Sequence, residues 1–460
     1  MWSGRFREPL NAEFERWQAS FGFDVRLLSQ EVAASKAHAK AIAAAGILTG
    51  DELAHTFRGL DDVATLASEP AAALVASAPN AEDIHHFVEL QLAKRIGTLA
   101  LKLHTGRSRN EQIATDMRLF VRESIDAAVT GLRGWARALV DIAEDAGEAV
   151  MPSYTHLQRA EPVLVAHWLL AYVSMIERDI SRLEDARKRL NLCPLGSGAV
   201  AGATLALDRT IAARELGFDG PTPNSMDATS DRDFMLDFVQ ATATAGLHIS
   251  RFAEEITLYS TAEFGFVDLP EAFSTGSSAM PQKKNPDFTE LIRGKAARLA
   301  GASTALAMMI KGLPLAYNKD LQEGQEQVFD AADTITGMVA ILPPFTRALR
   351  FRFDRMRTAA STGYLNAMAA ATYLSNKGVP FRKAHEIVGN AVRLGLETGR
   401  ELNHLKLEEL RGLSDVFEQD FFEAIALEAT LDCHDVVGGT ARARVASAVA
   451  AAKARLGENK

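Results

Sequence analysis

Long stretches of the chain repeat apolar side chains every three or four residues, the period of an amphipathic α-helix. The clearest stripe runs for about thirty residues from Ile113 through Leu132 to Ile142. A second stripe starts after Pro162, a favourable first-turn residue, and continues to Leu190. Similar patterns cover residues 231–262, 286–310 and 321–342, so the sequence predicts five long helices between about 107 and 348.

Segments that alternate apolar and polar residues are scarce, so the predicted fold class is all-α. We expect an N-terminal helical domain at 1–106, a central long-helix bundle domain at 107–358 and a C-terminal helical domain at 359–460. Residues 291–310 are apolar on more than one helix face, which favours an oligomer in which other subunits cover that surface. Shorter helices are expected to end at Gly46, Gly97, Gly378, Gly395 and Gly412.

Composition excludes several classes of protein. The 460 residues include 50 Lys and Arg against 59 Asp and Glu, a formal net charge of −9, which argues against a general nucleic-acid binder. The two cysteines, Cys193 and Cys433, provide no disulfide framework or cysteine-rich zinc site. Neither a signal peptide nor an unbroken apolar run of about 18 residues is present, so we expect a cytoplasmic protein without a membrane anchor.

Three polar segments interrupt the helical patterns, at residues 104–110 (HTGRSRN), 153–158 (SYTHLQ) and 274–286 (STGSSAMPQKKNP). Their hydroxyls, amides and cations are the groups that bind a carboxylate-rich ligand. The glycine-rich run at 196–202 follows no predicted strand, so a nucleotide cofactor is not expected. His85 and His86 are adjacent and therefore point to different helix faces, which makes a poor metal site.

Residues 276–286 (GSSAMPQKKNP) resemble the signature loop G-S-x-x-M-x-x-K-x-N of the fumarase/aspartase superfamily. We call these residues the signature loop. Four further segments resemble the argininosuccinate lyase family, which includes the δ-crystallins of some eye lenses. They are HTGRSRN at 104–110, MPSYTHLQ at 151–158, NSMDATSDRDF at 224–234 and AYNKDLQE at 316–323. The resemblance extends from Trp2 to the GGTA near Gly438, essentially the whole chain.

The resemblance implies roles for individual residues. Ser277 would be the proton acceptor, and Lys283 with Asn285 would hold a substrate carboxylate. His156, paired with Glu290, would pass a proton to the leaving nitrogen. The resemblance also assigns substrate-binding or pocket-lining positions to Ser20, Asp24, Asp83, Arg107, Ser108, Arg109, Asn110, Thr155, Gln158, Tyr317, Lys319 and Gln322. Many of these side chains could instead be helix caps or solvated surface groups.

The implied activity is reversible cleavage of argininosuccinate to arginine and fumarate, without cofactor or metal, in a homotetramer whose active sites are shared between subunits. Two alternatives stay open: a lyase for another N-substituted aspartate, and a catalytically silent relative of the crystallin type. The sequence departs from the family pattern at Ser153, where Gly is common, and at Glu161, where Gln is common. It also has Gly324-Gln325 where Asp-Lys is usual, next to the expected substrate pocket.

Overall fold

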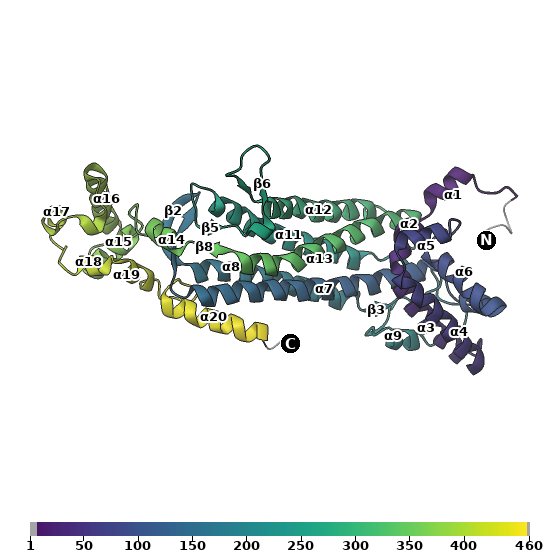
Figure 1. The fold of residues 1–460 in the computed structure, drawn as a ribbon. Coiled ribbons are helices and arrows are strands. Elements are labelled where there is room, and N and C mark those ends of the chain that lie inside the picture. Colours follow the sequence, from purple (N-terminus) through teal and green to yellow (C-terminus); the bar gives the residue numbers. More distant parts are fainter. Residues whose placement is uncertain (1–6, 458–460) are drawn as a thin grey trace. The chain divides into compact units, whose positions relative to one another are not determined.

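A computed structural model describes residues 7–457; Trp2, at which the family resemblance begins, lies outside the described residues. The chain is mainly α-helical, as the sequence predicts, and Figure 1 shows its long helices running side by side. The five predicted long helices are present: α7 (Arg109–Ala146), α8 (Val165–Leu190), α11 (Asp233–Ser260), α12 (Asp287–Ile310) and α13 (Glu323–Ala348).

The predicted apolar stripe of α7 is the buried face of that helix. Met117, Val121, Ile125 and Leu132 are completely buried, as the three-to-four spacing requires. Trp135 continues the stripe. Its ring meets Phe252 of α11 edge to face at a centroid distance of 5.3 Å, and its indole N–H donates a 3.1 Å hydrogen bond to Thr346 Oγ1 of α13. The polar atom of this large core residue is therefore satisfied.

Helix α13 extends beyond its predicted end at Leu342, through Pro343 and Pro344, to Ala348. Two prolines remove two backbone donors, but Phe345 and Thr346 beyond them are buried, so packing keeps this last turn helical. Together with the helical turn that precedes it, α13 forms a segment, Lys319–Ala348, that is long and apolar enough to cross a membrane. More than half of its most apolar window is buried inside the protein, as in an ordinary core helix, so the evidence for a membrane span is weak.

The long helices belong to two compact units. Unit 1 contains Met1–Val129, Ser181–Gly246 and Ala296–Thr336, and unit 2 contains Thr130–Ile180, Leu247–Lys295 and Gly337–Lys460. Every long helix contributes one part to each unit. This division follows spatial contacts, and the three-domain organisation along the chain stays a prediction.

Unit 1 adds a layer of shorter helices to its share of the long ones. Phe21 and Phe87 stack in its core with ring centroids 4.8 Å apart. The shorter helices of unit 1 are α1 (Ala12–Gln18), α2 (Phe21–Asp24), α3 (Leu28–Ala44), α4 (Gly50–Ala64), α5 (Ala71–Ser77), α6 (Ile84–Ile96), α9 (Arg209–Glu215) and α10 (Ser225–Ser230).

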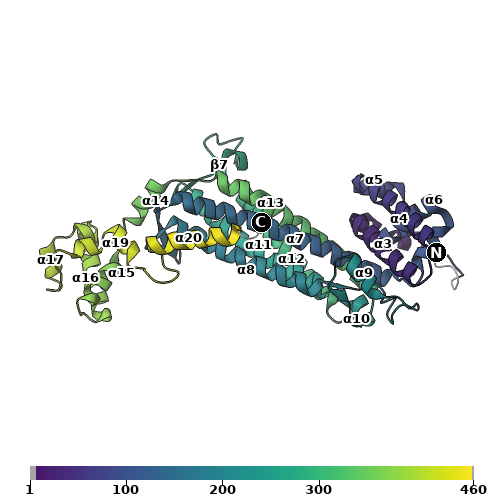
Figure 2. The same cartoon turned by 90° about the horizontal axis from the view of Figure 1, so that it is seen from below.

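Unit 2 contains the C-terminal helices. The last of them, α20 (Arg442–Gly457), lies along the unit 2 parts of α7 and α8 (Figure 2), where Lys453 pairs with Glu144 and Arg455 with Glu177. The shorter helices of unit 2 are α14 (Phe353–Ala360), α15 (Ala367–Asn376), α16 (Phe381–Thr398), α17 (Leu407–Arg411), α18 (Phe421–Ala424), α19 (Leu427–Asp432) and α20 (Arg442–Gly457).

The described residues also form four two-stranded sheets, which the sequence did not predict. The longest is an antiparallel hairpin of β1 (Val150–Thr155) and β2 (Gln158–Leu164), and His156 and Leu157 turn it with φ of 55° and 57°. A bulge lies next to Ser153, whose hydroxyl donates to the Glu161 carbonyl at 2.7 Å. The other pairs are β3 (Leu192–Cys193) with β4 (Gly220–Pro221), β5 (Val267–Asp268) with β8 (Arg350–Phe351), and β6 (Thr275–Gly276) with β7 (Lys284–Asn285).

Glycines end four short helices where predicted, but the expected helix end at Gly395 is wrong. Gly395 lies inside α16, which ends three residues later, before the left-handed Gly399. A Cβ on Gly395 would sit 2.6 Å from the Arg400 carbonyl oxygen and 2.7 Å from the Tyr364 ring. Close packing therefore explains this glycine. The confirmed helix ends are Gly46, Gly97, Gly378 and Gly412.

We expect Gly395→Ala to lower the free energy of unfolding by ~1–3 kcal/mol, because the added methyl overpacks a rigid contact. Gly389→Ala, in the same helix, is the matched control: nothing lies within 4 Å of its Cβ position, so the change should be neutral or stabilising by up to ~1 kcal/mol. Urea unfolding followed by circular dichroism measures both. Equal effects of the two substitutions would contradict the packing explanation.

Candidate active site

Eight of the predicted substrate-binding residues line one pocket of about 160 Å³ in unit 1. We call it the unit 1 pocket. They come from chain segments about 300 positions apart in sequence, and the structure brings them together. The eight are Ser20, Asp24, Asp83, Arg109, Asn110, Tyr317, Lys319 and Gln322, and the same pocket is lined by Glu82, His85, Ile113 and Gln325.

Local hydrogen bonds fix the acidic side of the unit 1 pocket. Ser20 Oγ donates to Asp24 Oδ2 at 2.6 Å. Asp83 Oδ1 accepts from the His86 N–H at 2.7 Å and so caps α6, while its Oδ2 accepts from Arg109 at 2.9 Å. The capping and ligand-binding roles of Asp83 are therefore compatible, because each uses a different carboxylate oxygen.

The carboxyl group of Asp24 is suited to bind a positively charged ligand group. It is almost completely buried, and burial raises the pKa of its carboxyl to about 7. Its second oxygen, Oδ1, is buried and has no hydrogen-bond partner among the described residues. An unpaired buried carboxylate oxygen is costly unless a ligand supplies a donor. The pocket thus suits a positively charged group.

The opposite side of the unit 1 pocket comes from the segment around α13. Gln322 Nε2 donates to the Gln18 carbonyl at 3.0 Å, and Lys319 Nζ lies 3.6 Å from Glu82. Gln325, one of the family departures, is buried in the pocket wall with an unpartnered Oε1. At Gly324 a Cβ would sit 2.6 Å from Met309 Cε and 2.9 Å from Leu306 Cδ1, so a larger side chain there requires the ends of these two flexible side chains to shift.

A buried polar cluster lies beneath the unit 1 pocket, and sequence reasoning missed it. Glu31 is its centre: its carboxylate accepts from Ser35 at 2.7 Å and from Gln112 at 3.1 Å, and His85 Nδ1 lies 2.7 Å from Glu31 Oε2. We call these four residues with Arg107 and Asp116 the Glu31 cluster. Its members occupy α3, α6, α7 and the turn before α7, so no single sequence motif contains them.

The HTGRSRN segment contributes to the cluster and to a second pocket. Arg107 is turned inward, where it donates to Ser35 Oγ at 2.8 Å, and Ser108 Oγ caps the start of α7 by accepting from the Asn110 N–H at 3.3 Å. The neighbouring pocket, of about 820 Å³, is lined by residues 106–110 and by the glycine-rich residues 198–204. Ligand contacts of Arg107 and Ser108 stay a prediction.

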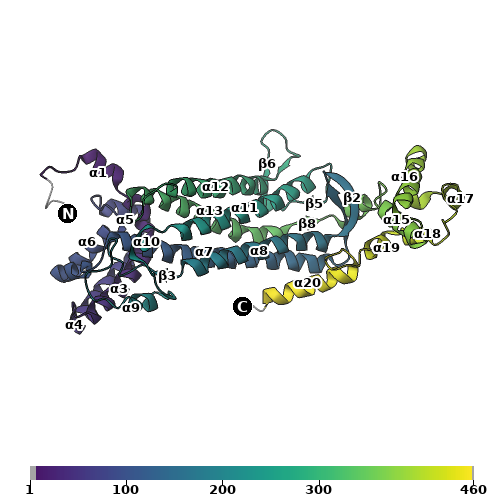
Figure 3. The ribbon, with the colours of Figure 1, turned by 180° about the vertical axis from the view of Figure 1, so that it is seen from behind.

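The signature loop lies in unit 2, closed by the β6–β7 pair, and projects beside the start of α12 (Figure 3). Ser277 is half-buried, and its Oγ accepts from the N–H groups of Ala279 at 3.3 Å and Met280 at 3.1 Å. Lys283 is exposed, whereas Lys284 Nζ is held by Asp268 and by the Leu269 carbonyl, both at 2.7 Å. Lys284 therefore anchors the loop.

Asn285, near the end of the signature loop, and Glu290, beyond it, make only weak contacts. Asn285 Nδ2 donates to Thr275 Oγ1 at 3.3 Å, and Glu290 is exposed, 3.9 Å from Arg293. In the part of the chain that the structure describes, no hydrogen bond or ion pair joins His156 to Glu290. Their pairing stays a prediction.

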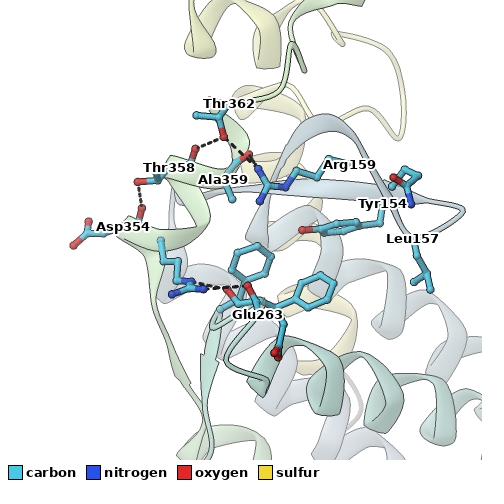
Figure 4. Close-up of a pocket in the computed structure, with 12 residues that line it drawn as sticks. Tyr154, Leu157, Arg159, Glu263, Asp354, Thr358, Ala359 and Thr362 are labelled. Atoms are coloured by element: carbon cyan, nitrogen blue, oxygen red, sulfur yellow. Dashed lines mark hydrogen bonds between the residues drawn. The ribbon is translucent and has the colours of Figure 1, made fainter. Parts of the chain in front are cut away.

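The β1–β2 hairpin carries the other predicted groups. Thr155, His156 and Gln158 are exposed at its turn. Of these three, Gln158 lines a hollow of about 910 Å³ between the hairpin and α14 (Figure 4), together with Tyr154 and Arg159. In the close-up, Arg159 reaches from the hairpin to α14 and the turn after it, donating to the Ala359 carbonyl and Thr362 Oγ1 at 3.2 Å each.

Comparison with known proteins identifies the class to which this fold and these polar loops belong. The family model described as "Lyase" matches residues 4–301, and the chain is a lyase with the helical fold of the fumarase/aspartase superfamily. A second model, "Argininosuccinate lyase C-terminal", matches residues 364–432. The argininosuccinate lyase of Acidobacterium capsulatum is 63% identical over 100% of this chain and 95% of its own length. The chain belongs to the argininosuccinate lyase family.

A further sequence relative agrees with the family assignment, and two solved structures agree with the fold. The argininosuccinate lyase of Koribacter versatilis is 56% identical over 99% of this chain and 97% of its own length. An EDDS lyase variant with bound fumarate superposes with a TM-score of 0.84 at 26% identity, covering 98% of this chain and 91% of that chain. The 3-carboxy-cis,cis-muconate lactonizing enzyme of Pseudomonas putida has a TM-score of 0.77 at 19% identity, covering 97% and 100%, and shows the shared fold alone.

Proposed function

We propose that this carbon–nitrogen lyase cleaves argininosuccinate reversibly to arginine and fumarate, and that the unit 1 pocket binds the cationic arginine half. The observation that carries the proposal is the buried Asp24 carboxylate with its unpartnered oxygen, beside Asp83 and the polar residues Tyr317 and Gln322. A carboxylate in this position pairs with an ammonium or guanidinium group.

Ser277 is the proposed base. A free serine hydroxyl is too weak a base at neutral pH, but the N–H groups of Ala279 and Met280 already point at its Oγ and would stabilise an alkoxide. Ser277, as the alkoxide, takes the proton from the succinyl Cβ and becomes a neutral hydroxyl. The C–H electron pair moves into the adjacent carboxylate, which becomes a dianionic aci-carboxylate. The signature loop must close over substrate to exclude water, because its residues are largely exposed.

The second step breaks the carbon–nitrogen bond. The electron pair of the aci-carboxylate forms the fumarate double bond, and the guanidinium nitrogen leaves with the bonding pair. Lys283 and Asn285 stabilise the carboxylate charge, and His156, oriented by Glu290, supplies a proton to the leaving nitrogen. The carboxylate is itself the electron sink, so the proposed chemistry uses no cofactor.

We further propose that the protein is a cytoplasmic homotetramer whose active sites take residues from different subunits. Two observations support this. Large apolar side chains are exposed along α11 and α12, namely Leu247, Leu291 and Met308, and burial in an oligomer would remove them from water. His156 and Glu290 are also both exposed, so a residue from another subunit can reach either one.

The test of the activity is a substrate panel. Purified protein receives argininosuccinate, adenylosuccinate, aspartate or malate, and fumarate formation is followed by absorbance. We expect fumarate from argininosuccinate, with one arginine released per fumarate. A second candidate, a lyase for another N-substituted aspartate, is favoured by Gln325 in the pocket wall where the family usually has Lys. Turnover of adenylosuccinate in place of argininosuccinate would support that candidate, whereas turnover of aspartate or malate alone would contradict both, because neither compound is an N-substituted aspartate.

A further inference from the structure

The Glu31 cluster holds a histidine that the chemistry above does not use. His85 is buried, lines the unit 1 pocket, and contacts the cluster through Nδ1: Glu31 Oε2 is 2.7 Å away and Asp116 Oδ2 is 3.7 Å away. Because Nδ1 is engaged by Glu31, the ring is fixed and its other nitrogen, Nε2, is left for a different neighbour.

The charges around His85 favour a proton on the imidazole. Burial is the largest single influence and lowers the pKa of His85, but the charge and hydrogen bond of Glu31 together with the charges of Asp83 and Asp24 outweigh it, so the pKa is raised. Burial and the Glu31 charge raise the pKa of Asp116 well above its ordinary value, which favours the neutral form of this carboxyl. One anion, Glu31, thus stabilises one imidazolium.

Glu31, His85 and Asp116 offer ligand atoms that lie within 4.8 Å of one another, the spacing of a metal site. The hydrogen-bond donors around Glu31 indicate that this carboxylate is paired with a protonated His85 and not with a metal ion. Ser35, Gln112 and His85 already occupy its oxygens, and the Arg107 guanidinium lies 3.8 Å away. A divalent cation would have to displace these donors next to an existing positive charge.

We propose that His85 is a positioning residue of the unit 1 pocket: held by Glu31 as a buried imidazolium, it keeps Asp24 ionised so that Asp24 can pair with the cationic half of the substrate. This role rests on the proposed function of the pocket. Asp24 needs such help because it is buried beside another carboxylate, Asp83, which disfavours its charge. Several titratable or charged groups surround Asp24 and His85. They are Asp83, Asp116, Tyr317, Glu31 and, through Glu31, Arg107, together with Glu82, Arg109 and Lys319 in the lining of the same pocket.

The direction of the pH effect follows from the Asp24 carboxyl. Its pKa of about 7 means that its charge, and with it the affinity for a cation, is lost as pH falls through neutrality. Removing the positive charge of His85 raises the Asp24 pKa further. The pH at which affinity is lost should therefore move upward, while affinity at high pH, where Asp24 is ionised in either protein, is retained.

The experiment measures KM for argininosuccinate from pH 6 to 9.5 in wild type, His85→Asn and Glu31→Gln. We expect the ratio of variant to wild-type KM to be about tenfold at pH 6.5, as for a shift of roughly one pKa unit, and to approach one at pH 9.5. Glu31→Gln should act in the same direction, because it removes the anion that keeps His85 charged. Asp24→Asn should abolish the pH-dependent rise of KM altogether.

His38→Asn is the matched control. His38 is equally buried, but burial lowers its pKa to about 3, so it is neutral, and its Nε2 contacts the Thr105 carbonyl. The His38→Asn substitution should leave unchanged the pH at which affinity for argininosuccinate is lost. A KM ratio for His85→Asn that does not vary with pH would overturn the proposal. Failure of wild type to form fumarate from argininosuccinate would instead refute the proposed function.

Discussion

Ser277→Ala is expected to lower kcat for argininosuccinate cleavage by ~10²–10⁴ while the fold and oligomer persist. The methyl group keeps the volume of the half-buried side chain but removes the oxygen at which the Ala279 and Met280 N–H groups point. Substrate binding should be nearly normal, because the loop backbone is retained. Steady-state kinetics with a binding measurement on the inactive variant checks both parts.

The neighbouring Ser278→Ala is the control for Ser277→Ala, because Ser278 is exposed in the same loop. It should retain at least a tenth of wild-type turnover. Ser277→Ala with turnover at or above that level would show that another group is the base.

Lys283→Ala should lower kcat by ~10²–10³ with a smaller change in KM, because the carboxylate charge that Lys283 is proposed to stabilise peaks in the carbanion. Gln322→Ala should instead act mainly through KM, since Gln322 lines the unit 1 pocket, which we propose binds a part of the substrate remote from the reacting carbon. Substrate titrations on both variants separate the effects. A thousandfold loss of kcat in Gln322→Ala at unchanged KM would contradict this division between recognition and chemistry.

The long helices could be predicted from the sequence because their stability comes from a periodic apolar face, and the period is visible in one dimension. Completely buried positions such as Met117 and Leu132 recur at that period. The β1–β2 hairpin has no such signal: His156 and Leu157 turn it in a left-handed conformation that non-glycine residues rarely adopt. The residues of the MPSYTHLQ segment resemble a family motif, but their pattern of apolar and polar positions does not indicate that they belong to a strand pair.

The unit 1 pocket was predictable only through the family resemblance. Periodicity gives no reason to join Asp24 to Tyr317, and Asp83 by itself is equally a helix cap. The Glu31 cluster was not predicted, because each member is a single polar residue on the buried side of a different element, and its partners become apparent only when those elements pack. His85 was considered solely as a metal ligand next to His86, which left its pairing with Glu31 unseen.

Subunit complementation tests most directly whether one active site takes Ser277 and His156 from different chains. Inactive Ser277→Ala and His156→Asn proteins are mixed, partly denatured and reassembled, and subunit exchange is confirmed by mass spectrometry of the mixed oligomers. Random reassembly should make about a quarter of the sites wild type at both positions, with activity recovered in proportion. Samples that stay inactive despite confirmed exchange would show that each site is built within one subunit, which contradicts the proposed architecture.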